Sequence, residues 1–434
     1  MPPPGIAANF LQEGGSMARN KKDPGKLLSS AVMLFYFSAF LLIACKDYAW
    51  QGFALALAVP AMIWIGTNLL PRLFPSDRLL LSLTNFLCAL GVLVLYSTEP
   101  EYAYNQAMYY GVGIAAMIVC VWIVRLIRSW RVPVLLLMPV SLVLLTLPLL
   151  IGRETNGATN WFYVGNLSVQ PSEIVKLSLL LIISYYMSRH RMLPWLGFAV
   201  CCLALLMLQK DLGTALMYYG TTLLLYYASS SNLLLTGVGL AGGAGAAVLG
   251  YQMFAHVKKR VAIWLNPWSD YENSGFQIVQ GLMAIASGGL IGVGLGLGSP
   301  KTIPVYYTDF IFAVICEQFG LIFGLCVLLM YVALIWRGAT IAMAARRSFH
   351  GLLAMGCTLM LGLQTFVIIG GVIKMIPLTG VTMPFVSYGG TSLVSSLCLV
   401  GLLQGVASLN EDDLEEDTRL ALLGSAEDEE EMEA

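Results

Sequence analysis

The sequence contains little charge for its length. Asp, Glu, Lys and Arg make up only 11% of its 434 residues, whereas a soluble domain usually has about a quarter. Hydrophobic residues make up 58% of the chain, and the formal net charge is only −1. These proportions exclude an ordinary soluble domain and predict that lipid surrounds most of the chain. We expect no nucleic-acid partner for such a chain.

Histidine is scarce, and the cysteines are poorly placed for cross-links or metal binding. The three histidines, His190, His256 and His350, lie far apart in the sequence. All nine cysteines lie inside hydrophobic runs, where cysteine behaves as a small apolar residue. We therefore predict no disulfide framework and no metal site built from these residues.

The two ends of the chain lack hydrophobic runs. Residues 1–26 contain Pro, Gly and Lys without the apolar core of a signal peptide, so we expect a disordered tail. Residues 410–434 are crowded with Asp and Glu. Such a block of like charge is typical of a solvated, disordered tail, and a docking role is the alternative.

Between these ends, hydrophobic runs of about 20 residues recur, each long enough to cross about 30 Å of hydrocarbon. Lipid offers no partners to exposed backbone groups, so the runs must be helices. We predict an all-α polytopic integral membrane protein with about 12 transmembrane helices. They begin near residues 28, 50, 79, 106, 134, 171, 193, 212, 233, 309, 350 and 388.

Lysine and arginine concentrate in every second connection between these spans. Because short cytoplasmic loops carry the excess of positive charge, both termini are predicted to be cytoplasmic. The long connections at 152–170 and about 253–308, and a shorter one at 374–388, then face outward. We expect the chemistry there, since loops on a rigid scaffold usually carry function.

Ionisable residues at the outward ends of the spans are costly in lipid, so each is a functional candidate. They are Glu173, Lys176, Lys210, Asp211, Asp309, Glu317 and Lys374. Asp309 opens a span and is either a partly desolvated general base or a helix cap. Glu317 lies eight residues later on nearly the same helix face. We expect Glu317 to pair with Lys176 or Lys210.

Lys258, Lys259 and Arg260 form the densest cationic cluster in an outward connection. Positive charge there departs from the usual topology rule, which suggests an anionic ligand. Contact with anionic lipid head groups explains the cluster equally well.

Four stretches of the sequence occur together, in this order, in one known family. They are GATNWFYVGNLSVQPSEIVKL from Gly157, QKDLGTAL from Gln209, the stretch from Gly275 that contains TDFIFA, and IPLTGVTMPFVSYGGTSL from Ile376. With these motifs the chain resembles the SEDS family (shape, elongation, division and sporulation). This family is the FtsW/RodA/SpoVE group of peptidoglycan glycosyltransferases, and the chain resembles its RodA-like twelve-span form.

The resemblance implies a ten-helix core at residues 75–409, preceded here by an extra helix pair at 27–74. It implies that Asp309 is the catalytic residue. The substrate would be lipid II, a disaccharide peptide on undecaprenyl pyrophosphate, at the outer face of the bacterial cytoplasmic membrane. We expect substrate-binding roles for Trp161, Glu173, Lys176, Lys258, Lys259, Arg260, Lys301, Glu317 and Ser387.

The resemblance further implies a class B penicillin-binding protein as partner and leaves a divalent cation open. The chain departs from the family pattern just ahead of Asp309, where Val305 and Tyr307 replace the usual Glu and His. Two rival functions are a transporter of lipid-linked precursors and a division scaffold without activity.

Overall fold

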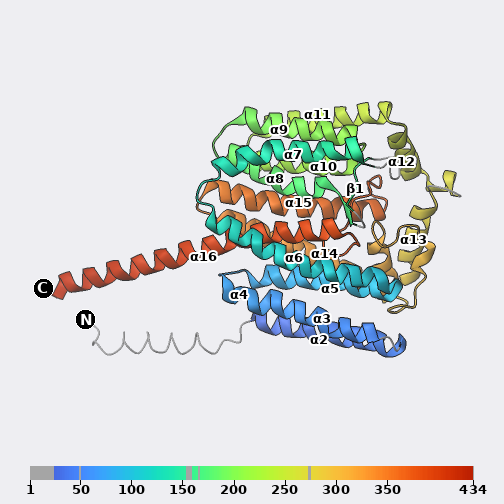
Figure 1. Cartoon of the computed structure of the whole chain (residues 1–434), viewed down its shortest axis with the longest axis horizontal. Helices are drawn as coiled ribbons and strands as arrows, with labels where there is room; N and C mark the ends of the chain where they lie inside the picture. Colours follow the sequence, from blue (N-terminus) through green and yellow to red (C-terminus); the bar gives the residue numbers. More distant parts are fainter. Residues whose placement is uncertain (1–23, 48–49, 153–158, 165–166, 272–274, 434) are drawn as a thin grey trace.

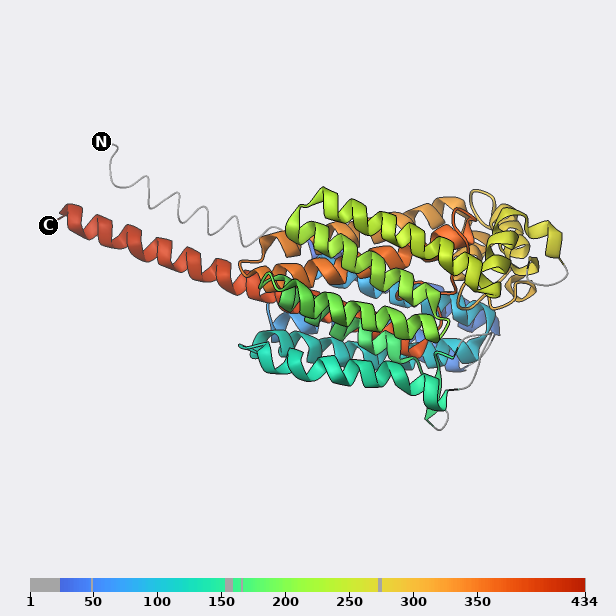
Figure 2. The ribbon, with the colours of Figure 1, turned by 90° about the horizontal axis from the view of Figure 1, so that it is seen from above.

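The protein is a bundle of long helices that run in roughly the same direction (Figures 1 and 2). Its computed structural model describes residues 24–47, 50–152, 159–164, 167–271 and 275–433. The expected disorder of residues 1–26 therefore falls almost entirely outside the described residues. The α2 and α3 pair lies at one edge of the bundle, and α9 and α11 lie at the opposite edge (Figure 1).

Twelve long helices among the described residues occupy the positions predicted from the hydrophobic runs. They are α2 Pro24–Asp47, α3 Trp50–Trp64, α5 Arg78–Thr98, α6 Pro100–Leu126, α7 Arg131–Ile151, α8 Pro171–Met187, α9 Met192–Leu208, α10 Leu212–Ser230, α11 Leu233–Met253, α14 Ile311–Ala344, α15 Ser348–Val372 and α16 Gly390–Glu433. Eight of these are long and apolar enough to cross a membrane. The other four, α2, α8, α9 and α10, are shorter or more polar and lie within the same bundle. The prediction of a polytopic all-α membrane protein is confirmed.

Helix α5 is enclosed by its neighbours, with 89% of its most apolar stretch buried inside the protein. It packs against α6, α14 and α2, while α16 packs mainly along α6. The Asp77 carboxylate caps α5 by accepting a hydrogen bond from the Leu80 amide at 2.8 Å. The Gln404 side chain of α16 binds both the N–H and the C=O of Asp77, each at 2.9 Å. The start of α5 is thereby joined to α16.

Polar contacts join the N-terminal helices to one another and to α5. Helix α3 continues through a π-helical turn, η1 (Ile65–Leu69), into α4 (Leu70–Leu73). The hydroxyls of Ser29 and Thr67 share a hydrogen bond of 2.6 Å, and Tyr36 donates to the Phe86 carbonyl at 2.7 Å. Buried polar groups keep such partners because an unpaired one is costly.

The connection at 253–308, which we predict to face outward, contains more regular structure than expected. It forms α12 (Ala255–Leu265), η2 (Pro267–Asp270), α13 (Phe276–Gly288) and η3 (Pro300–Thr302). The connection at 152–170 carries a short antiparallel hairpin of β1 (Phe162–Val164) and β2 (Leu167–Val169). These elements are too short to cross a membrane, so they gave no signal in a search for long apolar runs.

The acidic C-terminal segment, for which we expect a disordered tail, belongs to helix α16 in the structure. Helix α16 continues without interruption to Glu433 and projects beyond the bundle (Figure 2). Ion pairs join its first acidic turns to other helices. Asp412 lies 3.1 Å from Arg125, and both Asp413 and Asp417 pair with Arg346. Opposite charges on neighbouring helices therefore offset the repulsion within the acidic block.

Candidate functional site

A cavity of about 270 Å³ lies at the end of the bundle where α8, α10 and α14 begin. This end carries β1 and α12 and is at the right in Figure 1. Its walls come from the connection at 152–170, α8, the start of α10, α12, the segment before α14, α15 and the segment before α16. They are formed by Asn160, Trp161, Gln170, Glu173, Lys210, Asp211, Leu212, Gly213, Thr214, Met217, Arg260, Val305, Thr308, Asp309, Gln364, Thr379, Gly380, Val381 and Thr382.

Asp309 lies in the short segment that leads into α14. Phe310 occupies the N-cap position of that helix, so Asp309 does not serve as its cap. Two hydrogen bonds fix the segment: Ser387 donates to the Thr308 carbonyl at 2.6 Å, and the Tyr388 amide donates to the Tyr307 carbonyl at 2.9 Å. These two hydrogen bonds hold the backbone just before Asp309 to the segment before α16. The Asp309 carboxylate lines the cavity from this fixed backbone.

Burial raises the pKa of Asp309 from 3.8 to about 6, because a low dielectric penalises the ionised form. A hydrogen bond with the Thr308 side chain and the charge of Arg260 act in the opposite direction. With this pKa the carboxylate is mostly ionised at neutral pH and can still accept a proton readily. This is the range in which general bases work best.

Arg260 reaches the cavity from α12 and is held by the segment before α16. Its Nη1 donates to the carbonyls of Thr379 at 2.9 Å and Leu378 at 3.3 Å. Gly380, with φ of +77°, lies where a Cβ atom would be 3.7 Å from Asp309 Oδ2 and 3.9 Å from Arg260 Nη2. The glycine therefore leaves open the space that the carboxylate and the guanidinium border.

The opposite wall is organised around Asp211. Its Oδ1 caps α10 by accepting from the Thr214 amide at 3.1 Å. Its Oδ2 accepts from the side-chain amides of Asn160 at 3.0 Å and Gln170 at 3.1 Å. Because both of its oxygens accept hydrogen bonds, Asp211 holds the connection at 152–170 against the start of α10. Asp309 is the better placed of the two carboxylates for proton transfer.

A buried ion pair supports the cavity from below. Lys176 lies 2.5 Å from Glu173 on the same helix, and Ser395 of α16 donates to Glu173 Oε2 at 2.6 Å. Lys176 also reaches Gln364 of α15 at 3.4 Å, and Gln364 donates to the Thr382 carbonyl at 2.9 Å. This network joins α8, α15 and α16 beneath the cavity.

Six of the residues selected from the sequence line the cavity together: Asp309, Trp161, Glu173, Arg260, Lys210 and Asp211. Lys176 lies directly behind them through its pair with Glu173. Ser387 is buried and holds the backbone before Asp309.

The remaining cations lie elsewhere. Lys258 is exposed, Lys259 faces Asp270 at 3.9 Å, and Lys301 pairs with Glu99 at 2.8 Å. Successive residues on a helix point about 100° apart, so only one member of the 258–260 cluster faces the cavity.

The predicted pairing of Glu317 with Lys176 or Lys210 is wrong. Glu317 Oε1 instead accepts a hydrogen bond from the Ser299 amide at 3.0 Å, outside the cavity. Lys176 pairs with Glu173, three residues earlier on its own helix, because that carboxylate is nearer.

Sequence reasoning missed several neutral polar residues of the cavity: Asn160, Gln170, Gln364, Thr379 and Thr382. Asn160, Gln170, Thr379 and Thr382 lie within the family motifs but carry no charge that would single them out, whereas Gln364 carried a signal of its own. It is a polar residue within an apolar span and is 1% exposed, and such residues normally face a partner inside the bundle.

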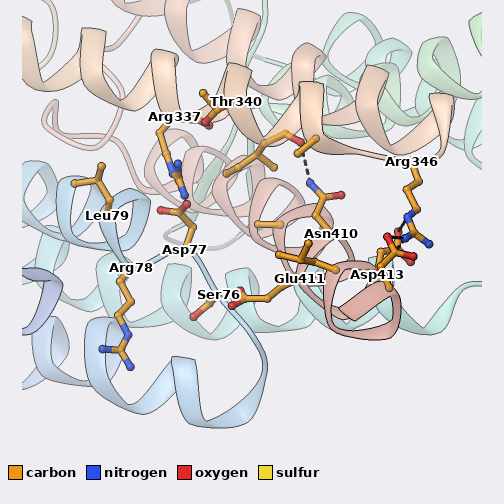
Figure 3. A pocket seen from close by; sticks show the side chains of 15 residues that line it. Ser76, Asp77, Arg78, Leu79, Arg337, Thr340, Arg346, Asn410, Glu411 and Asp413 are labelled. Carbon is orange, nitrogen blue, oxygen red and sulfur yellow. Dashed lines mark hydrogen bonds and ion pairs between the residues drawn. The ribbon is translucent and has the colours of Figure 1, made fainter. Parts of the chain in front are cut away.

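A larger cavity of about 720 Å³ lies at the other end of the bundle, between the start of α5, the end of α14 and α16 (Figure 3). Its charges are largely paired with one another: Asp77 with Arg337, and Arg346 with Asp413. Asn410 donates to the Ile341 carbonyl at 2.9 Å. These pairs join α5, α14 and α16, so we assign this cavity a structural role, although it is larger than the Asp309 cavity.

Comparison with known proteins agrees with this geometry. Residues 77–412 match the FtsW/RodA/SpoVE family model, described as "Cell cycle protein". The stage V sporulation protein E of Bacillus subtilis is 34% identical over 364 residues, which cover 76% of this chain and 96% of that protein. The peptidoglycan glycosyltransferase RodA of Mycobacterium bovis is 31% identical over 418 residues, covering 88% and 89% respectively.

Among solved structures, one chain of a peptidoglycan synthase complex, studied for its coordination of polymerization and crosslinking, aligns with a TM-score of 0.66 and 28% identity. The alignment covers 78% of this chain and 98% of that one. The resemblance recognised in the sequence is confirmed. This multi-pass membrane protein belongs to the FtsW/RodA/SpoVE family of cell cycle proteins.

Proposed function

We propose that the chain is a peptidoglycan glycosyltransferase that polymerises lipid II into glycan strands. The observation that carries the proposal is Asp309. This carboxylate has a pKa raised to about 6 and faces a cavity beside Arg260. The name of the mycobacterial relative states the same activity.

In the proposed reaction Asp309 is the general base. It accepts the proton of the 4-hydroxyl group of the acceptor N-acetylglucosamine as that oxygen attacks the anomeric carbon of the donor N-acetylmuramic acid. The bond from this carbon to the pyrophosphate breaks, the carbon inverts, and undecaprenyl pyrophosphate leaves with the bonding electrons. A base in this role contributes about 10²- to 10⁴-fold in rate.

Arg260 and Lys210 are the cations that line the cavity. We assign them to the pyrophosphate, since a guanidinium matches phosphate oxygens in geometry and charge. Trp161 and Glu173 line the same cavity and would border the sugar rings. Among the described residues, no three His, Cys, Asp or Glu side chains gather closely enough to hold a metal ion.

We propose that the Asp309 end faces outward and that both termini are cytoplasmic. Arg125, Arg337 and Arg346 support this orientation, because they lie at the helix ends opposite Asp309, where the positive-inside rule expects them. Lipid II would then be polymerised at the outer face of the cytoplasmic membrane.

Cross-linking of the glycan is assigned to a partner. The solved relative comes from a complex that couples polymerization with crosslinking. The cavity of this chain lacks, among its described residues, a serine and lysine placed for transpeptidation. We therefore propose a class B penicillin-binding protein as the partner.

The deciding experiment measures glycan polymer made from purified lipid II by this protein with its penicillin-binding partner. Asp309→Asn should lower the rate at least about 100-fold, as expected for removal of a general base. Asp270→Asn is the matched control, because it removes an equal charge from the outer segment outside the cavity, and it should retain activity.

Equal polymer from wild type and Asp309→Asn would overturn the assignment of the base. If the wild type makes no polymer while a known family polymerase works in the same assay, the transport and scaffold functions replace this proposal.

A further inference from the structure

Glu317 is a buried acid that the proposed reaction does not use. It lies in the second turn of α14 and is 6% exposed. Its Oε1 accepts a hydrogen bond from the Ser299 amide at 3.0 Å. Ser299 lies in the glycine-rich segment that leads to Asp309, ten residues before it.

Helix α14 is interrupted beside Glu317. Gly320 has φ of +85° and ψ of 169°, far from helical values. The backbone groups freed by this break bond to residues 289–294. The bonds are Val293 N to Glu317 O at 2.9 Å, Gly294 N to Gln318 O at 3.0 Å, Leu321 N to Gly289 O at 2.9 Å and Ile322 N to Leu290 O at 3.3 Å. The segment and the broken helix therefore form one interlocked unit.

The glycines of this segment are required by close approach. A Cβ atom at Gly288 would lie 2.1 Å from the Cys316 carbonyl oxygen, and one at Gly292 would lie 2.3 Å from that of Gln318. At Gly298 the three atoms nearest to a Cβ would all belong to the Glu317 side chain, with Cδ and Oε2 both at 2.7 Å. The Glu317 carboxylate thus packs directly onto the segment at 298–299.

We infer that Glu317 is a positioning residue for Asp309. It anchors the start of the irregular stretch 299–308, while Ser387 anchors its end at the Thr308 carbonyl. Between these anchors the stretch contains only η3 and turns, so its path to Asp309 depends on both. A shift of about 1 Å in a reacting group costs about 100-fold in rate. This catalytic consequence rests on the proposed function.

The first test compares two substitutions at Glu317. Glu317→Gln keeps the length of the side chain and an oxygen that accepts the Ser299 N–H, so its kcat should stay within about threefold of wild type. Glu317→Ala removes the acceptor and should lower kcat about 10- to 100-fold with little change in KM. Equal kcat for wild type and Glu317→Ala, or equal losses in both variants, would overturn the inference.

The second test disturbs the same contact from the other side. Gly298 has a φ outside the left-handed region, so Gly298→Ala meets no left-handed backbone strain, and its Cβ would displace the Glu317 carboxylate. Gly298→Ala should reproduce the loss of kcat. The double variant Gly298→Ala/Glu317→Ala should have a kcat no lower than that of Glu317→Ala alone. Additive losses in this double-mutant cycle would contradict the contact. Gly197→Ala, where a Cβ meets nothing within 4 Å, is the control.

A third measurement does not depend on activity. Hydrogen–deuterium exchange of peptides covering 299–308 should be faster in Glu317→Ala and Gly298→Ala than in wild type or Glu317→Gln, while peptides of α5 stay protected. Unchanged exchange in Glu317→Ala would refute the anchor even if no variant polymerises lipid II. Faster exchange in a protein without polymerase activity would instead refute the proposed function alone.

Discussion

At the scale of single residues, the surroundings of Asp309 set the pH range of the proposed reaction. Burial raises its pKa from 3.8 to about 6. A general base must be ionised, so kcat/KM should be constant above about pH 7 and fall about tenfold per unit below pH 6. Polymerisation rates measured between pH 4.5 and 8 check this. An acidic limb centred near pH 4 would contradict it.

The same shift predicts a cost in stability. The folded pKa lies above the unfolded one, so the ionised carboxylate destabilises the fold above about pH 6 and has no effect below about pH 4, where both states are protonated. Asp309→Asn should have the same melting temperature as the wild type at pH 4 and a higher melting temperature than the wild type at pH 7.5. Thermal unfolding in detergent at both pH values tests this. A lower melting temperature at pH 7.5 would show that the carboxylate makes stabilising contacts.

Arg260 and Lys258 offer a matched comparison on one helix. Both residues are exposed, but Arg260 lines the cavity and Lys258 does not. Hydrogen bonds to charged groups contribute about 1.5–3 kcal/mol. Arg260→Ala should therefore lower kcat/KM for lipid II about 10- to 100-fold, whereas Lys258→Ala should change it less than about twofold. Initial rates at varied lipid II concentration distinguish them, and equal effects would assign the pyrophosphate to the exposed cluster instead.

At the scale of elements, the Glu173–Lys176 pair holds α8 to α15 and α16. Its side chains are 12% and 2% exposed. Breaking a buried pair by removing one partner usually costs about 3–5 kcal/mol, because the other charge stays buried and unpaired. Lys176→Met should therefore lower the melting temperature markedly, and adding Glu173→Gln should restore part of it. A double variant less stable than Lys176→Met alone would contradict this account.

The long helices were predictable because each is an apolar run whose length matches the bilayer. Helix α12 was not, since its eleven residues include Lys258, Lys259 and Arg260 and resemble a charged loop. The helical continuation of α16 also escaped prediction. Its acidic turns depend on Arg125 and Arg346 of other helices, and a charge pattern read along one segment contains no information about those partners.

At the scale of the whole molecule, the orientation makes the two ends chemically distinguishable. In a variant whose nine cysteines have been replaced, Ser269→Cys should react with a membrane-impermeant maleimide on intact cells. Glu416→Cys should react only after permeabilisation. Both residues are exposed, so accessibility within the protein does not limit either reaction. The reverse pattern would place the Asp309 cavity on the cytoplasmic side.

The sequence led to six residues of the cavity but not to all of it: Asp309, Trp161, Glu173, Arg260, Lys210 and Asp211. The charged residues were found because charge near lipid is rare and motifs marked some of them. Asn160, Gln170 and Thr382 are ordinary polar residues in connections, and their importance arises from contacts with Asp211 and Gln364 across the bundle. Such contacts depend on which helices become neighbours, which no local pattern in the chain specifies.

The junction between Asp77 and Gln404 has a consequence for synthesis of the protein. It joins α5, where the family match begins, to α16, where it ends. The cavity also needs residues 379–382, and Ser387 must be present to hold Thr308. Nearly the entire chain must therefore be synthesised and inserted before Asp309 reaches its final setting. Chains truncated before Ser387 should consequently lack polymerase activity, and assembly of the last helix should complete the site.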